Sequence, residues 1–434
     1  MKSIFLIIIL GLSIHLICAQ NINVPIDLKN LVDQSLQKYP KVSEMNDLVN
    51  LNQVKVGLGK AAYYPSAMGE LSYRMQYPTP YIPFSTGNGQ TNNVNIQPAN
   101  NYNATININQ PLIDFRINSQ LNKFKSELNI SKDNLDGFKL NLAYQVAQIY
   151  YSIIFLKNCL SVQHEQINLL KSTLQQIGVK VKNGDALSYD LVSTEVKYTN
   201  AGNFYTELKS QLDKQYNILN MLTENSGKDY LNETSFITSA FNLIIDSVST
   251  ITYENNPDII IAGDKIKSAN WDIVSADRSR LPVLNLQAGI GYKNGYMPDI
   301  NAVNLNYFAG LGIIIPILPS SRPAYQRKMA VINHHASQMA LETQKATLNK
   351  DLHNAQDDIK KNQKKLNSAD TLIMQAQLAL KLADDRYKFG VITNLELLTA
   401  VSNYKDAQLS QLQFEYNLLV SRMDLCRLAG IRWW

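Results

Sequence analysis

Cysteine is scarce in this sequence, and neither sign of charge dominates it. The 434 residues include three cysteines, and the two outside the N-terminal segment, Cys159 and Cys426, are too few and too far apart to indicate a disulfide framework. The net charge is only +5. A nucleic-acid surface would need clustered basic side chains with aromatic residues between them, so we expect no nucleic-acid partner.

Long apolar runs are also absent, apart from one short run at the N-terminus. Lys2 is followed by an apolar stretch at residues 4–16 and a small residue, Ala19. This order is typical of a secretory signal peptide, which we assign to residues 1–19. A lipoprotein signal at Cys18 is an alternative, although the residues before it fit that pattern poorly. No later run could span a membrane as a helix, so the sequence predicts an exported chain.

Signatures of catalysis are missing too. His334, His335 and His353 fall in one predicted helix, but no glutamate completes the H-E-x-x-H arrangement of a zinc hydrolase. The glycines of residues 289–295 have the wrong spacing for a dinucleotide-binding loop. No nucleophile motif is visible. We therefore expect no enzymatic activity, no catalytic residues, no metal site and no cofactor.

Four segments alternate between apolar and polar residues, as strands with two unlike faces do. In one of them Leu284 and Ile290 share a face, and Asn285 and Gln287 share the other. The segments are residues 66–77, 102–110, 283–293 and 305–315. Each is about ten residues long, which suits a tilted strand that crosses a bilayer, and tyrosines cluster near their ends as in outer-membrane barrels. Residues 78–101, rich in Asn, Gly and Pro, predict a loop.

The number of strands limits the architecture. A soluble sandwich with one wet face is the alternative, but four strands make a poor sandwich, and the long polar helices offer no second layer. Four strands also cannot close a barrel, since about eight is the smallest number that does. Open strand edges are excluded from lipid. The sequence therefore predicts an α+β membrane protein in which several chains share one barrel.

Two long segments, residues 117–222 and 322–428, carry apolar residues three and four apart, which is the spacing of coiled-coil packing. Glycine interrupts each segment once, at Gly184 and at Gly390, and glycine readily takes the left-handed angles that end a helix. Each segment therefore predicts two antiparallel helices joined by a tight turn. Thr393 or Asn394 can cap the helix that returns from the second turn.

The two predicted turns repeat each other. Gly390 follows Gly184 by 206 residues (390 minus 184), and Glu396 follows Asp190 by the same 206. Both acids fall in the first turn of a returning helix, where the helix dipole favours a carboxylate. The repetition predicts an internal duplication. The predicted order is a signal peptide at 1–19, a first repeat at 20–226, a linker at 227–250 and a second repeat at 251–434.

This order of elements resembles that of the TolC-like outer-membrane efflux channels. The resemblance rests on the order of helix, strand pair and helix pair in both halves, on Pro65 and Pro282 before the strand pairs, and on the two turns. It implies a homotrimer with a shared barrel in outer-membrane lipid and a long antiparallel coiled-coil tunnel in the periplasm. It also implies that the tunnel tip docks onto a periplasmic adaptor protein and an inner-membrane pump.

The resemblance also assigns roles to residues near the tips. A tyrosine and an aspartate that help close the periplasmic entrance fall on Tyr387 and Asp190, and Glu396 takes the matching place in the second repeat. The expected turns for adaptor docking contain Gly184, Gly390 and Thr393. The family's gating arginine and second gating aspartate are replaced here by Ile392 and Thr399, so only part of the closing network carries over.

The expected function is an exit duct for small molecules or proteins in a tripartite efflux or secretion system. The outer-membrane component of type I protein secretion is an alternative, because cargoes of several kinds leave through channels of this shape. An exported coiled-coil scaffold or adhesin is a third reading. Salt or carbonate would release a scaffold from membranes, whereas a channel would need detergent. The sequence identifies neither the cargo nor the adaptor.

Overall fold

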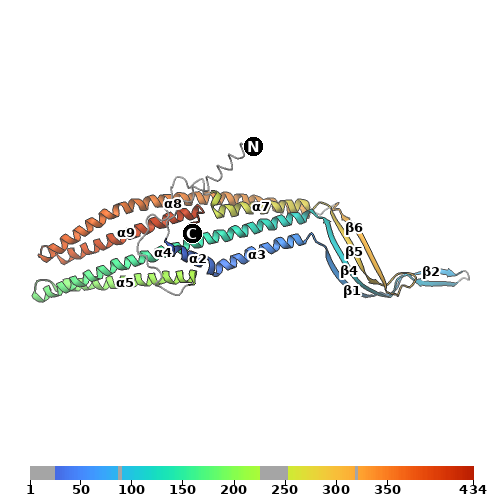
Figure 1. The fold of residues 1–434 in the computed structure, drawn as a ribbon, viewed down its shortest axis with the longest axis horizontal. Coiled ribbons are helices and arrows are strands. Elements are labelled where there is room, and N and C mark those ends of the chain that lie inside the picture. Colours follow the sequence, from blue (N-terminus) through green and yellow to red (C-terminus); the bar gives the residue numbers. More distant parts are fainter. Residues whose placement is uncertain (1–24, 87–89, 225–252, 318–320) are drawn as a thin grey trace, which may run out of the picture. The chain divides into compact units, whose positions relative to one another are not determined.

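The computed structural model describes residues 25–86, 90–224, 253–317 and 321–434 (Figure 1). The predicted signal peptide and the predicted linker lie outside the described residues. The described residues belong to two compact units: one is drawn from 1–46, 133–260 and 342–434, the other from 47–132 and 261–341. Each unit thus takes segments from both predicted repeats. Within the described part of the chain, no helix is both long and apolar enough to cross a membrane.

Helices dominate the described chain, and a smaller part forms strands. The helices are α2 (Ile26–Lys38), α3 (Pro40–Ala61), α4 (Phe115–Asn183), α5 (Ser188–Thr223), α7 (Pro257–Arg278), α8 (Arg322–Lys388) and α9 (Asn394–Leu428). The strands are β1 (Ser66–Met75), β2 (Tyr81–Thr86), β3 (Gln90–Asn95), β4 (Asn100–Ile113), β5 (Val283–Lys293) and β6 (Asn304–Ile314). At 69 and 67 residues, α4 and α8 each extend on the order of 100 Å at 1.5 Å per residue.

Four strands form one antiparallel sheet in the order β1-β4-β5-β6. The central pair, β4 and β5, joins segments about 180 residues apart in the sequence, and Ile106 lies opposite Ile290. Outer strands β1 and β6 each have one sheet neighbour, so each presents a row of backbone groups that no described strand pairs.

The loop predicted at residues 78–101 is wrong in part, because it contains a hairpin. Strands β2 and β3 pair with each other, with Ile82 opposite Val94. The hairpin forms a separate two-stranded sheet (Figure 1). Strand propensity does not predict this hairpin, because proline and asparagine are depleted in strands. The hairpin contains Pro83 in β2 and several asparagines in β3. Two strands that pair only with each other tolerate these residues, since each has a free edge.

Polar contacts tie together the helix ends in the unit that carries the sheet. Lys123 of α4 pairs with Asp272 of α7 at 2.7 Å. Arg278, at the end of α7, donates to the Ser119 hydroxyl of α4 at 3.1 Å. These charge-assisted hydrogen bonds hold the start of α4, which follows β4, against the end of α7, which precedes β5.

The apolar core of the helical unit lies along α4. Tyr150, Tyr151, Ile153 and Ile154 are fully buried there. Burial of a large side chain of this kind contributes about 1.5–3 kcal/mol. A second cluster joins α8 to α9 and comprises Leu348, Leu352, Ala355, Ile359, Leu418, Leu425, Leu428 and Ala429. The three- and four-residue spacing of the α8 members puts them on one face of that helix.

Both cysteines in the described chain are free and buried. Desolvation raises the pKa of the Cys159 thiol to about 12, and it raises the pKa of Cys426 to about 12 as well. Each thiol is therefore protonated at neutral pH and unreactive. Their role is packing: Cys159 lies in a cluster with Leu156 and Leu208.

Candidate functional site

The two helical pairs end in turns of the same kind. Gly184 has a φ of +83°, and Gly390 has a φ of +71°. In the first turn, the Gly184 N–H donates to Val181 O at 3.1 Å and the Asp185 N–H donates to Lys180 O at 2.8 Å. The second turn repeats both bonds, with the donors shifted to residues 390 and 391. This is the Schellman arrangement, in which glycine takes the left-handed position.

Both returning helices begin with a first-turn carboxylate that accepts from the N-cap backbone, and α9 adds a side-chain cap. The Thr393 N–H donates to the Glu396 carboxylate at 2.7 Å, and the Glu396 N–H donates to the Thr393 hydroxyl oxygen at 3.3 Å, which completes a capping box. The Thr393 hydroxyl also donates to the carboxylate at 2.9 Å, and the hydrogen bonds from the Thr393 backbone and hydroxyl lower the pKa of Glu396. In α5 the Leu187 N–H donates to the Asp190 carboxylate at 3.4 Å. Both acids therefore stabilise the starts of their own helices.

The two tips are bound to each other through Asn394. This first residue of α9 is buried, and its Nδ2 donates to Asp190 O at 3.2 Å and to the Thr194 hydroxyl at 3.0 Å. Thr194 is itself fully buried. A buried amide that loses its partners costs about 1–3 kcal/mol, so these bonds favour contact between the start of α9 and the start of α5.

Tyr387 is the apolar centre of the same contact. Its side chain is buried and packs with Ile177 and Leu397. Lys180 of α4 reaches it twice: Nζ lies 4.2 Å from the ring centroid and donates to Tyr387 O at 3.2 Å. Burial, and then the negative charge of Asp190, raise the pKa of Tyr387, so the phenol is neutral at physiological pH. The structure thus brings Tyr387 and Asp190 together.

Sequence reasoning missed Lys180, and it considered Asn394 only as a possible cap of α9. Neither matches a family gating residue, and their importance arises from contacts about 200 residues away in the sequence. Ile392 and Thr399, the two positions without the charged residues that the resemblance implies, make local contacts. Ile392 is partly buried against the Tyr387 cluster, and the Thr399 hydroxyl donates to Leu395 O within α9.

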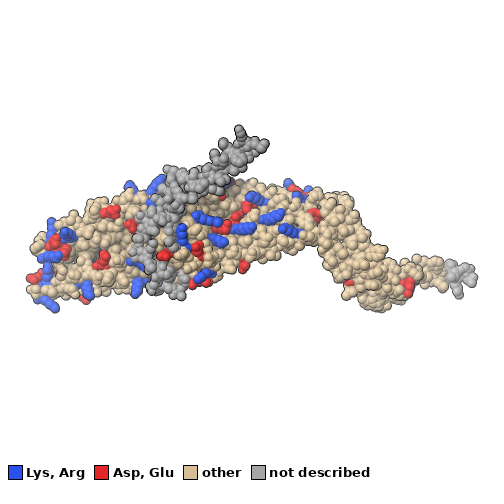
Figure 2. Space-filling view, in the orientation of Figure 1, with Lys and Arg blue, Asp and Glu red and all other residues tan. Residues whose placement is uncertain are grey.

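The outer surface of the tips combines apolar and charged side chains. Phe389 is 84% exposed, and Leu187 and Val391 are each 69% exposed. Lys388 pairs with Asp384 at 2.6 Å on the neighbouring surface. Figure 2 shows basic and acidic side chains interspersed at this end of the helical unit. The turns therefore present apolar side chains within a charged surround.

The sheet presents two unlike faces. One row of the register joins Leu71, Ala104, Tyr292 and Leu305, and the next joins Gly69, Ile106, Ile290 and Tyr307. Leu71 and Tyr307 on this face are 88% and 82% exposed. The opposite face carries Ser72, Asn103, Lys293 and Asn304 in one row. The alternation predicted from the sequence thus places an apolar face and a polar face on one sheet.

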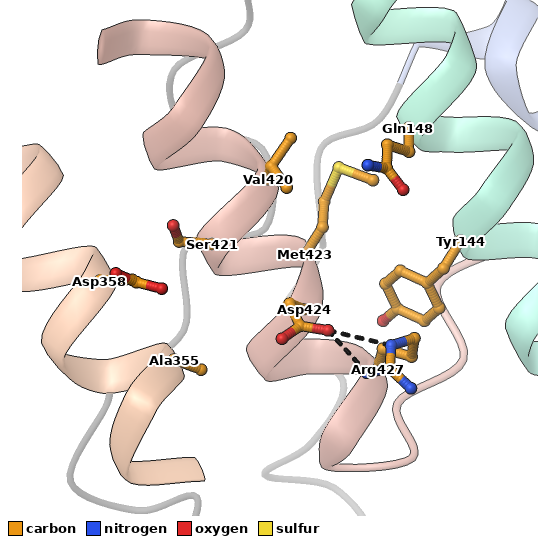
Figure 3. Close-up of a pocket in the computed structure, with 9 residues that line it drawn as sticks. All are labelled: Tyr144, Gln148, Ala355, Asp358, Val420, Ser421, Met423, Asp424 and Arg427. Atoms are coloured by element: carbon orange, nitrogen blue, oxygen red, sulfur yellow. Dashed lines mark hydrogen bonds and ion pairs between the residues drawn. The ribbon is translucent and has the colours of Figure 1, made fainter. Parts of the chain in front are cut away.

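A cavity of about 220 Å³ lies between α4, α8 and α9 (Figure 3). Tyr144, Asp358, Asp424 and Arg427 are among the residues that line it. Arg427 donates to Asp424 at 2.7 Å, so these two charges neutralise each other. None of the site residues predicted from the sequence lines this cavity. Within the described residues, no group of three His, Cys, Asp or Glu side chains could hold a metal ion.

Residues 31–223 and 249–431 match the outer membrane efflux protein family. The chain belongs to this family. The matched segments end close to the ends of α5 and α9, and each includes two strands of the four-stranded sheet and one helical tip. The members of this family are outer-membrane channels rather than enzymes.

Solved structures share the fold. A structure of CusC matches with a TM-score of 0.81 over 95% of this chain and 94% of that chain, at 18% identity. The CmeC outer-membrane channel of Campylobacter jejuni matches with a TM-score of 0.76 over 93% and 86%, at 17% identity. The MtrE channel of Neisseria gonorrhoeae, in its open state, matches with a TM-score of 0.75 over 93% and 88%, at 18% identity. At these identities the likeness establishes the fold.

A curated relative is the toxin and drug export protein A of Aggregatibacter actinomycetemcomitans, which is 24% identical over 301 residues. The match covers 66% of this chain and 63% of the relative. The chain therefore spans less than two thirds of the length of this relative.

The turn glycines generate a first prediction. Gly390→Ala should lower the free energy of opening at the α8–α9 turn by about 1–2 kcal/mol, because a Cβ is strained at left-handed angles. Gly202→Ala is the matched control, since Gly202 is helical and a Cβ there has nothing within 4 Å. Hydrogen exchange of the flanking amides measures both. Equal protection in the two variants would contradict the turn geometry.

The capping box generates a second prediction. Thr393→Ala should weaken the first turn of α9 by about 1 kcal/mol. Because the folded pKa of Glu396 is depressed, its capping contribution is present at neutral pH and is lost as the pH falls through that folded pKa. The protection factors of the amides at the α9 start, which correct for the intrinsic pH dependence of exchange, should therefore fall on acidification, and less so in Thr393→Ala. Thr399→Ala is the control, and an unchanged acid response in Thr393→Ala would refute the cap.

Proposed function

We propose that three copies of this chain form an exit duct in the bacterial outer membrane, with the long helices as a tunnel in the periplasm. One observation carries the proposal: a four-stranded sheet exposes an apolar face and leaves β1 and β6 unpaired at its edges. Unpaired backbone groups cost several kcal/mol each in hydrocarbon. A barrel shared between chains, with β1 of one chain beside β6 of the next, satisfies them.

The two faces of the sheet then take two environments. The apolar face, with Leu71 and Tyr307, contacts outer-membrane lipid, and the polar face, with Asn103 and Lys293, lines the lumen. Membership of the outer membrane efflux protein family supports this orientation. The repeats at 20–226 and 251–434, and the signal peptide at 1–19, belong to the same proposal, since an internal duplication supplies two strand pairs per chain and export delivers the chain to the outer membrane.

The helical tips are the proposed contact with a periplasmic adaptor protein and, through it, an inner-membrane pump. The turns at Gly184 and Gly390 and the cap at Thr393 shape this surface. Exposed apolar side chains there, such as Phe389 and Leu187, suit contact with another helical tip, because their burial would add to affinity.

Two cargo classes remain compatible with this duct. The name of the Aggregatibacter actinomycetemcomitans relative contains both toxin and drug export, so it supports small-molecule efflux and type I protein secretion alike. A coiled-coil scaffold or adhesin has less support, because it gives no role to a sheet whose apolar face is exposed.

The assembly is the third prediction. Detergent should be needed to extract the protein, and native mass spectrometry of the extract should show a trimer without a folded monomer, because a lone sheet has two open edges. Carbonate extraction of the same membranes is the control for a peripheral scaffold. A monodisperse monomer with native circular dichroism in mild detergent would contradict the shared barrel.

The contact between the tips is the proposed closing device of the periplasmic aperture. Within one chain, Lys180 binds Tyr387, and Asn394 binds the start of α5. Three copies each of Asp190 and Glu396 would then surround the aperture. Glu396 is exposed and Asp190 partly so, which leaves both charges accessible to ions despite their capping bonds. A ring of carboxylates in a narrow opening concentrates cations.

The ring generates a fourth prediction. In planar bilayers the pore should select cations, and multivalent cations added on the periplasmic side should block it at low salt. Asp190→Asn combined with Glu396→Gln should abolish the block, since both replacements keep a capping oxygen and remove the charge. Tyr387→Ala, which removes the ring that packs with Ile177 and Leu397, should keep the block and raise the conductance.

Asp384→Asn is the matched control, because Asp384 is an exposed tip acid that pairs with Lys388. A block that survives the loss of Asp190 and Glu396 charges, or one that Asp384→Asn removes, would place the binding ring elsewhere in the tunnel.

A further inference from the structure

Apart from Val283 and Ile314 at one end of the sheet, large apolar side chains interrupt its polar face in one row. Three of its rows carry polar side chains or glycine from edge to edge, for example Glu70, Thr105, Gly291 and Asn306. The row beside that one joins Met68, Asn107, Gly289 and Phe308. Met68 is 66% exposed and Phe308 is 52% exposed. Large apolar side chains on an otherwise polar face call for a physical explanation.

The position of the Phe308 ring depends on Gly289. A Cβ built on Gly289 would lie 2.4 Å from Phe308 Cε1 and 2.9 Å from Cζ, closer than real carbon atoms approach. It would also lie 2.9 Å from Asn107 Oδ1. The ring therefore lies down over the glycine of the neighbouring strand, in the space that a side chain would fill. Gly289 is buried beneath it.

The neighbouring strand continues this arrangement. Asn107 lies on the other side of Gly289, and its Nδ2 donates to Glu70 Oε2 at 3.3 Å, which orients the amide. The result is an aromatic ring laid along the sheet, with one side on the glycine backbone and about half of its surface open. An open aromatic surface stacks with flat apolar groups, and such pairs gain about 0.5–1.5 kcal/mol beyond their burial.

We propose that Phe308, laid over Gly289 beside Asn107, is a contact site in the lumen wall for solutes with an aromatic ring. This inference rests on the proposed function, because the polar face lines a lumen only in the shared barrel. Three copies of the chain place three such rings at one level of the barrel. Cargo with a flat aromatic group is retained there briefly, while sugars and ions without such a group pass along the polar rows.

The test uses the purified full-length protein in planar bilayers and two neutral probes that differ in one group. Phenyl β-glucoside should reduce the ionic current at a concentration about two- to tenfold lower than methyl β-glucoside does. Phe308→Ala should abolish this difference between the probes. Phe308→Leu keeps an apolar side chain without a ring and should abolish most of it.

A second experiment substitutes Gly289, which changes the position of the Phe308 ring without removing it. Gly289→Ala should displace the ring from the wall and lower the conductance, and Gly289→Ala with Phe308→Ala should restore it. Gly310→Ala is the matched control on the same face, because a Cβ there has nothing within 4 Å. It should change neither the conductance nor the preference for the phenyl probe.

The outcomes separate the two claims. Open channels that block equally with both probes, or whose preference for the phenyl probe survives Phe308→Ala, would overturn the aromatic site and leave the duct intact. Purified protein that inserts but conducts no ions, even when Asn394→Ala removes the contact between the tips, would overturn the duct, and the lumen site with it.

Discussion

The unpaired backbone of the two outer strands is the constraint on which the structure depends. β1 and β6 each have a sheet neighbour on one side only, and the side chains of one sheet face are apolar and exposed. Water would satisfy the edges but not the apolar face, and lipid would satisfy the face but not the edges. In the proposed assembly, partner strands from further copies of the chain resolve the conflict. The shared barrel and the polar lumen that we propose rest on this requirement, whereas the number of copies does not follow from it.

The helical tips show how few residues can link two distant parts of a chain. The turns are set locally by glycine at left-handed angles, and the caps are set locally by Thr393 and the first-turn acids. The contact between the tips combines the polar bonds of Lys180 and Asn394 with the apolar cluster around Tyr387. Each of these contacts is modest in free energy, so a partner that binds the outer surface of the tips could separate them.

Much of this could be predicted from the sequence, because it depends on local patterns. Alternation along a strand determines which face a side chain takes, so the register places Leu284 and Leu305 on the apolar face as predicted. The hairpin of β2 and β3 escaped prediction, since its Pro83 and asparagines are unfavourable in strands. The ring of Phe308 escaped it too. Its position depends on a glycine in the adjacent strand, which only the register brings beneath it.

The two sides of the sheet can be tested directly by cysteine labelling of trimers in liposomes. Background is low, because Cys159 and Cys426 are buried. Gly310→Cys and Gly312→Cys should react with a charged thiol reagent from water, and Leu311→Cys and Ile313→Cys should react only with a maleimide dissolved in the lipid. Reaction of all four with the charged reagent would contradict a sheet that separates lipid from lumen.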